Sequence, residues 1–158
     1  VAKALARVSG GLYIVTAGNA DAQGGAKGAM VASWVSQASF EPLGVTIAVA
    51  KDRAIESLMQ VGDPFILNCL GEGEYSELMK HFLQRFAPGE DRFEGIAWTV
   101  GENGAPVLSV AIAAIQCRVS SRLETADHWV TYAEVTNGSV TKTEARTAVH
   151  RRRVANYY

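Results

Sequence analysis

The sequence has 158 residues, 48% of them hydrophobic, and a net charge of −1 at pH 7. This length and apolar content predict one domain over residues 1–158 with a real core, and the near-neutral charge excludes the broad basic surface of a nucleic-acid-binding protein. The longest apolar run, residues 107–115, is far too short for a membrane span, which needs roughly 20 residues. Because the chain opens on Val1 instead of methionine, we expect it to belong to a longer multidomain protein.

The first part of the chain predicts short strands joined by glycine-rich or proline-containing connections. A helical lead-in is expected over residues 1–8 and ends at Gly10-Gly11. Runs of β-branched, aromatic and small residues then predict strands at 12–17, 28–36 and 43–50. A polar hairpin connection at 18–28 separates the first two, and a loop at 37–41, broken by Pro42, precedes the third.

The remaining elements follow the same reasoning. A helix is expected from Ala54, with Asp52 as its N-cap and Gly62-Asp63-Pro64 after its end. Helical spacing of apolar residues predicts an amphipathic helix over 75–86. Strands are expected at 65–70, 96–100, 107–118 and 128–135; the long one at 107–118 could bend midway. Asn137-Gly138 indicates a tight hairpin after the last strand. Many strands with interspersed helices, but without regular βαβ alternation, favour a mainly β (α+β) fold: an antiparallel barrel or sheet that carries helices.

Cys69 and Cys117 lie far apart in apolar, strand-like contexts. We interpret them as buried free thiols, neither a disulfide nor a metal pair, which favours a reducing, cytoplasmic compartment. The three histidines lack the spacing of metal ligands, and no nucleophile motif is present. The sequence therefore predicts no metal site and no catalytic acid, base or nucleophile.

One stretch, Gly28 to Ser36, combines a strand with unusually small side chains at Ala32, Ser33 and Ser36. A flat molecule such as a flavin ring could approach this backbone and meet free N–H groups and two hydroxyls. The alternative is a small-residue strand that packs beneath another strand. These residues alone leave both interpretations open.

Charged residues mark three further candidate positions. Lys51-Asp52-Arg53 stands at a strand-to-helix junction, where phosphate could bind or an ordinary capped surface helix could begin. His128, at the start of a strand, could contact a flavin, a nicotinamide or a pyrophosphate, or only backbone. The basic run from His150 to Arg153 is either a solvated tail or a contact to dinucleotide phosphate or a neighbouring domain.

Taken in order, the motifs resemble the flavin reductase-like, FMN-binding split-barrel family. The resemblance rests on segments spread over nearly the whole chain: 12–17, 28–36 with Pro42, 51–55, 65–70, 106–108 with Cys117, 126–128 and 133–135. Ala126-Asp127-His128 is similar to a Gly-Asp-His segment of that family. The ending, residues 147–158, departs from the stand-alone reductases and looks like the C-terminus of the flavodiiron proteins of oxygenic phototrophs.

The resemblance implies an antiparallel Greek-key split β-barrel with flanking helices, and a homodimer. It implies non-covalent FMN (alternatively FAD), with NADH or NADPH as the co-substrate. Flavodoxin-like and di-iron domains of a parent chain would be partners. Cofactor contacts are expected from Met30, Ala32, Ser33, Trp34, Val35, Ser36, Lys51, Asp52, Arg53, Ala54 and Asn68. Contacts to the nicotinamide dinucleotide are expected from His128, His150 and Arg151.

The reaction implied is hydride transfer from nicotinamide C4 to flavin N5, followed by delivery of the electrons to a flavodiiron core that reduces oxygen. Such a transfer needs positioning and electrostatics more than a protein acid or base. The alternatives are a non-catalytic module that holds flavin as an electron relay or only bridges other domains, and a related barrel for heme or another flat cofactor.

Overall fold

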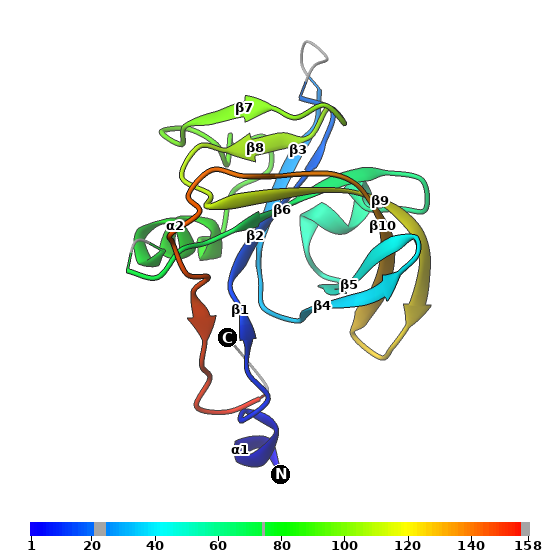
Figure 1. The fold of residues 1–158 in the computed structure, drawn as a ribbon, viewed down its shortest axis with the longest axis vertical. Helices are drawn as coiled ribbons and strands as arrows, with labels where there is room; N and C mark the ends of the chain where they lie inside the picture. The colour runs from blue at the N-terminus through cyan, green and yellow to red at the C-terminus, as the bar shows by residue number, and fades with distance from the viewer. Residues whose placement is uncertain (21–24, 74, 156–158) are drawn as a thin grey trace.

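The computed structural model describes residues 1–20, 25–73 and 75–155. Its centre is a seven-stranded antiparallel sheet (Figure 1). Across the sheet the strands follow the order β3 (Lys27–Ala32), β2 (Tyr13–Gly18), β6 (Pro64–Cys69), β9 (Ala113–Glu124), β10 (His128–Val140), β5 (Leu43–Ala50) and β4 (Val35–Phe40). The mainly β fold expected from the sequence is confirmed.

The sheet is rolled, because its two edge strands are neighbours in the sequence. Strand β3 ends at Ala32 and β4 begins at Val35, so only Ser33 and Trp34 separate the two opposite edges. The main chain of Trp34 is tied to β5, since the Ala48 N–H donates to the Trp34 carbonyl over 3.1 Å. The resulting barrel is split at this two-residue link, where β3 and β4 diverge without pairing.

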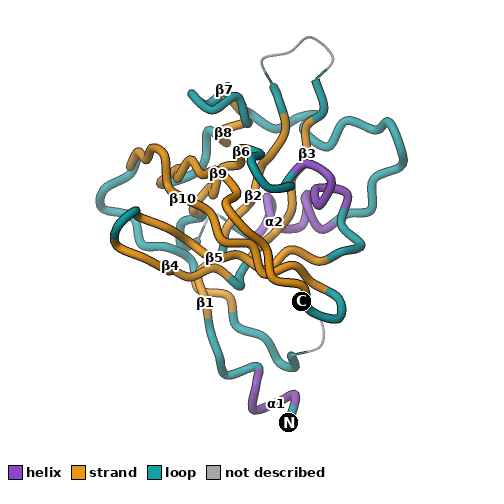
Figure 2. The backbone as a smooth tube through the Cα atoms, turned by 90° about the vertical axis from the view of Figure 1, so that its right-hand side faces the viewer, coloured by secondary structure: helices purple, strands orange, loops and turns teal. Residues whose placement is uncertain are grey.

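Side chains point alternately to the two faces of each strand, and this creates a hydrophobic core on each face of the sheet. On β2 and β3, Val15, Ala17, Met30 and Ala32 face the barrel interior and pack with Phe65 and Leu67. The other face of the same strands packs against α2 (Ser76–Leu83) through Leu78 and Phe82. Both α2 and the 3-10 helix η1 (Ala54–Leu58) lie against β3 (Figure 2).

Two small sheets complete the fold. Strands β7 (Trp98–Val100) and β8 (Pro106–Leu108) form a hairpin beside the barrel. Near the chain ends, β1 (Gly10–Gly11) pairs with β11 (Val149–His150), Gly10 opposite His150. We call β11 and the residues after it, 149–155, the C-terminal strap. β1 runs close to the Ser33 main chain, because a Cβ atom on Gly10 would lie 2.3 Å from the Ser33 carbonyl oxygen.

Several sequence-based boundaries are corrected. The lead-in helix α1 is only Ala2–Leu5, and the loop expected at 37–41 is largely strand β4. The strand expected over 107–118 is divided into β8 and β9, and Asn137-Gly138 forms no hairpin, because it lies inside β10 next to a bulge against β9. The connection expected at 18–28 joins β2 to β3, with its residues 21–24 outside the described part. Strand β11 was not anticipated.

The two thiols are buried and free, as the sequence predicted. Burial raises the pKa of Cys69 to about 11 and that of Cys117 to about 12. At pH 8 only about one Cys69 in a thousand would be the reactive thiolate. We therefore expect iodoacetamide at pH 8 to label the native protein at least 100-fold more slowly than the urea-unfolded protein, measured by mass spectrometry. Equal labelling rates would contradict the burial of both thiols.

Within the described residues, no helix is both long and apolar enough to cross a bilayer.

Candidate functional site: a cavity at the split of the barrel

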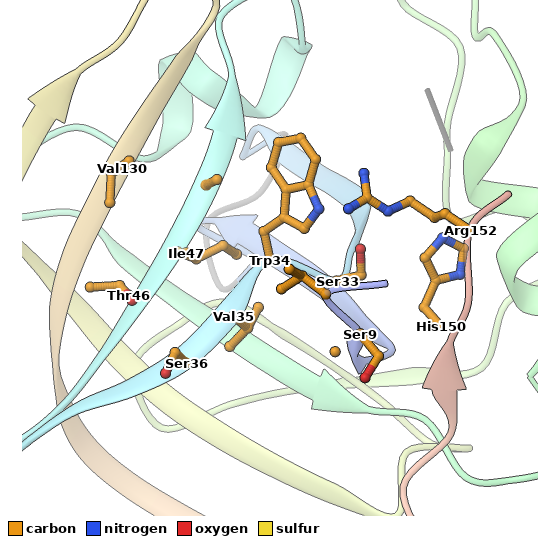
Figure 3. A pocket seen from close by; sticks show the side chains of 13 residues that line it. Ser9, Ser33, Trp34, Val35, Ser36, Thr46, Ile47, Val130, His150 and Arg152 are labelled. Carbon is orange, nitrogen blue, oxygen red and sulfur yellow. The ribbon is translucent and has the colours of Figure 1, made fainter. Parts of the chain in front are cut away.

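A cavity of about 470 Å³ opens where the barrel splits. Four parts of the chain line it: the segment 8–10 before and in β1, the link and start of β4 (33–36), the middle of β5 (46–48) with Val130 of β10, and the strap residues His150 and Arg152. Figure 3 shows these side chains around the opening. The cavity exists because the β3–β4 link leaves the sheet here and the paired chain ends close over it.

Ser33 is the most informative residue of the lining. Its side chain is 5% exposed, and its hydroxyl has no hydrogen-bond partner among the described residues. A buried hydroxyl left unpaired costs roughly 1–3 kcal/mol, so native proteins usually satisfy it. A ligand acceptor inside the cavity would satisfy Ser33 without disturbing the fold.

Trp34 forms a flat wall between two polar groups. The His128 ring is centred 4.9 Å from its indole, tilted by 42°, and the Arg152 guanidinium lies 5.1 Å from the indole centre. Figure 3 shows the Arg152 side chain extended toward Trp34. The indole is 38% exposed, so part of this aromatic surface is open to solvent.

The charge of the cavity is positive. Arg152 is a permanent cation, and no aspartate or glutamate is among the lining residues that the structure describes. Burial, and then the nearby Arg152, lower the pKa of His150 below its usual value. His150 is therefore mostly neutral at pH 7, and the cavity favours an anionic or electron-rich ligand.

The ring-contact residues expected from the sequence divide into two groups. Ser33, Trp34, Val35 and Ser36 line the cavity. Met30 and Ala32 instead point into the barrel core, where their exposures are 6% and 1%.

Asn68 has a structural role in the interior. Its amide donates to the Ile14 carbonyl and to Thr16 Oγ1, each over 3.0 Å, and its oxygen accepts the Leu108 N–H over 2.8 Å. Thr16 in turn donates to the Pro106 carbonyl. Asn68 therefore fixes β8 to β2 and β6, and it does not line the cavity.

The expected phosphate side has a different geometry from the one predicted. Asp52 is not the N-cap, because the N-cap is Arg53 and no side chain caps the helix, which is a five-residue 3-10 helix starting at Ala54. Lys51 pairs with Glu124 over 2.7 Å and lies over the Trp129 ring, while Arg53 is exposed. None of Lys51, Asp52, Arg53 and Ala54 lines the cavity, although β5 leads from it to Lys51.

The residues expected to contact the nicotinamide dinucleotide do not all lie at the cavity. His150 lines the cavity, whereas Arg151 is exposed and does not line it; Arg152, which was not singled out, does. His128 does not line the cavity; it flanks Trp34, and its Nδ1 lies 2.8 Å from Asp127 Oδ1. The described residues contain no group of three or more His, Cys, Asp or Glu side chains arranged for a metal.

Sequence reasoning missed the walls contributed by residues 8–10, by β5 and by Val130. The Gly10-Gly11 pair was interpreted only as the end of a helix. The structure shows why residue 10 is a glycine: β1 passes so close to the Ser33 main chain that a Cβ atom would not fit. The lining positions on β5 follow from strand register, which one sequence does not reveal.

Comparison with known proteins places the chain in a family. The profile of the family described as "Flavin reductase like domain" matches residues 5–157. The chain belongs to this family.

The curated relatives are larger proteins. The chain is 62% identical over 156 residues to Diflavin flavoprotein A 1 of Synechocystis sp., covering 99% of this chain and 26% of that protein. It is 61% identical over 156 residues to Putative diflavin flavoprotein A 3 of Nostoc sp., again covering 99% and 26%. The chain thus spans about a quarter of the length of these relatives.

Solved structures share the fold. The NADH:FAD oxidoreductase SgcE6 of Streptomyces globisporus C-1027 superposes with a TM-score of 0.82 at 24% identity, over 94% of this chain and 85% of that one. The flavin reductase HpaC, solved with NADP+, gives a TM-score of 0.78 at 21% identity, over 96% and 92%. At these identities the likeness establishes the split-barrel fold, which the sequence predicted.

Proposed function

We propose that this chain binds FMN in the cavity at the split of the barrel, accepts a hydride from NADPH or NADH, and passes the electrons on. Membership in the flavin reductase-like family supports an oxidoreductase role in general. The observation that carries the proposal is the buried, unpartnered hydroxyl of Ser33 in a cavity that is flat-walled, acid-free among its described residues and large enough for a ring system. FAD is the alternative flavin.

The residues present fit such a ring. Ser33 Oγ is a donor held in place by burial, and the Ser36 side chain is small enough to leave the wall open. Val35 and Val130 supply apolar surface that would exclude water from a bound ring. From the Trp34 wall, β5 runs to Lys51 and Arg53, which would meet the phosphate end of the flavin.

FMN, when bound, supplies the hydride acceptor and can release electrons onward. The protein's own contribution is to orient and to stabilise charge. Reduction adds negative charge to the site, and the Ser33 hydroxyl would stabilise that charge by donating a hydrogen bond without rearrangement. Neutral His150 adds no second cation at pH 7. This division of work requires no acid or base among the lining residues.

Within a longer protein, the module would feed electrons to flavodoxin-like and di-iron domains that reduce oxygen. The relatives' name, diflavin flavoprotein, supports a second flavin elsewhere in such a chain. Assembly as a homodimer is a prediction of the family resemblance, and a cytoplasmic location is a prediction from the two free thiols.

The test is anaerobic titration of the purified chain, first with FMN and then with each nicotinamide, followed by absorbance at the flavin bands. We expect a yellow complex that NADPH or NADH bleaches. Ser33→Ala should weaken FMN binding about tenfold, since it removes one donor to the ring, at about 1.4 kcal/mol.

Thr131→Val provides the matched control. Thr131 also carries a buried hydroxyl without a partner among the described residues, but it does not line the cavity. This variant should bind FMN like the parent chain. A chain that stays colourless with FMN, or equal losses in both variants, would overturn the proposed site.

A further inference from the structure

Arg152 is the basic residue of the strap that the fold turns inward. Its two neighbours, Arg151 and Arg153, are exposed, whereas Arg152 is half-buried in the cavity wall. Its guanidinium donates to the Ala155 carbonyl over 3.0 Å and makes no ion pair with any carboxylate of the described residues. A half-buried guanidinium without a counter-ion is suited to bind an anion.

Cationic side chains approach the Trp34 region from two directions. On the His128 side, β5 leads to Lys51 and Arg53, because His128 is paired with Ala50 in the sheet. Arg152 reaches the indole from the strap instead. A flavin phosphate directed along β5 would leave Arg152 available for the anion of a second ligand.

We propose that Arg152 binds a phosphate group of the nicotinamide dinucleotide and thereby docks this co-substrate beside the Trp34 wall. The inference rests on the proposed function, because it assumes that the same cavity receives a flavin and a dinucleotide. Within the strap, this binding role falls to Arg152 alone among the three arginines, because Arg151 and Arg153 are exposed and do not line the cavity.

The test compares Arg152→Gln, Arg152→Lys and Arg151→Gln with the parent chain. Calorimetric titration with NADP+, with and without FMN present, reports dinucleotide binding, and FMN fluorescence quenching separately reports flavin binding. We expect Arg152→Gln to raise the Kd for NADP+ about tenfold while leaving the Kd for FMN within about twofold. Arg152→Lys should retain part of the affinity, and Arg151→Gln should bind like the parent chain.

The two titrations separate the two proposals. Failure of the parent chain to bind FMN would refute the proposed function, while the NADP+ titration would still report on Arg152. Unchanged NADP+ affinity in Arg152→Gln, an equal loss in Arg151→Gln, or a parent chain that does not bind NADP+ would overturn the role of Arg152. A loss of FMN affinity without a loss of NADP+ affinity would also overturn it, by assigning the guanidinium to the flavin.

Discussion

Replacing Ser36 with tryptophan is expected to lower FMN affinity at least 100-fold, about 2.7 kcal/mol, while the protein stays folded. Ser36 lies at the start of β4 with an exposed side chain that lines the cavity. An indole at this position would occupy the space proposed for the flavin ring, and an exposed site imposes little folding cost. Fluorescence quenching of FMN measures the affinity, and urea unfolding measures the stability.

Ala38→Trp is the control for this substitution. Ala38 is exposed on the same strand but outside the cavity lining, so the same bulk there should leave FMN binding within about twofold. If Ser36→Trp bound FMN as tightly as the parent chain, the ring could not lie against this wall.

Replacing Asn68 with alanine is expected to destabilise the fold by roughly 3 kcal/mol or more. The change removes three buried hydrogen bonds, those of Asn68 with the Ile14 carbonyl, Thr16 Oγ1 and the Leu108 N–H. Urea unfolding followed by circular dichroism measures this loss. Asn68 was expected to contact the cofactor, and the fold instead requires it to join three strands.

Asn137→Ala tests the same chemical change at an exposed position. The Asn137 amide donates to Glu102 over 2.6 Å outside the core. Losing this exposed hydrogen bond should lower the free energy of unfolding by less than about 1 kcal/mol. A similar small effect at Asn68, together with a loss of FMN affinity, would return Asn68 to the cofactor site.

The architecture could be predicted because its signals are local. Strands such as β2 and β5 carry runs of β-branched residues, and α2 shows its buried positions Leu78 and Phe82 by spacing alone. Errors arose where tertiary contacts override local preference. Asn137-Gly138 is a strong turn signal, yet β9 pairs with it through a bulge. Strand β11 has two residues, too few to carry a pattern.

The candidate site was predictable where its residues are contiguous. Ser33 to Ser36 line the cavity because the small-residue link must cross from one sheet edge to the other. Arg152 was missed in favour of Arg151, since a run of three arginines does not show which one the strap turns inward. Lys51 was predicted to meet the phosphate of the flavin, and only the structure reveals its pairing with Glu124.

The pairing of Gly10 with His150 joins positions that are synthesised at the beginning and near the end of translation of this segment. Contacts of such wide sequence separation form late, because the intervening polypeptide must be ordered first. A nascent chain that still lacks residues 149–155 therefore lacks the cavity wall that His150 and Arg152 form. We therefore expect the cavity to be complete, and able to bind a ligand, only after the strap has been synthesised.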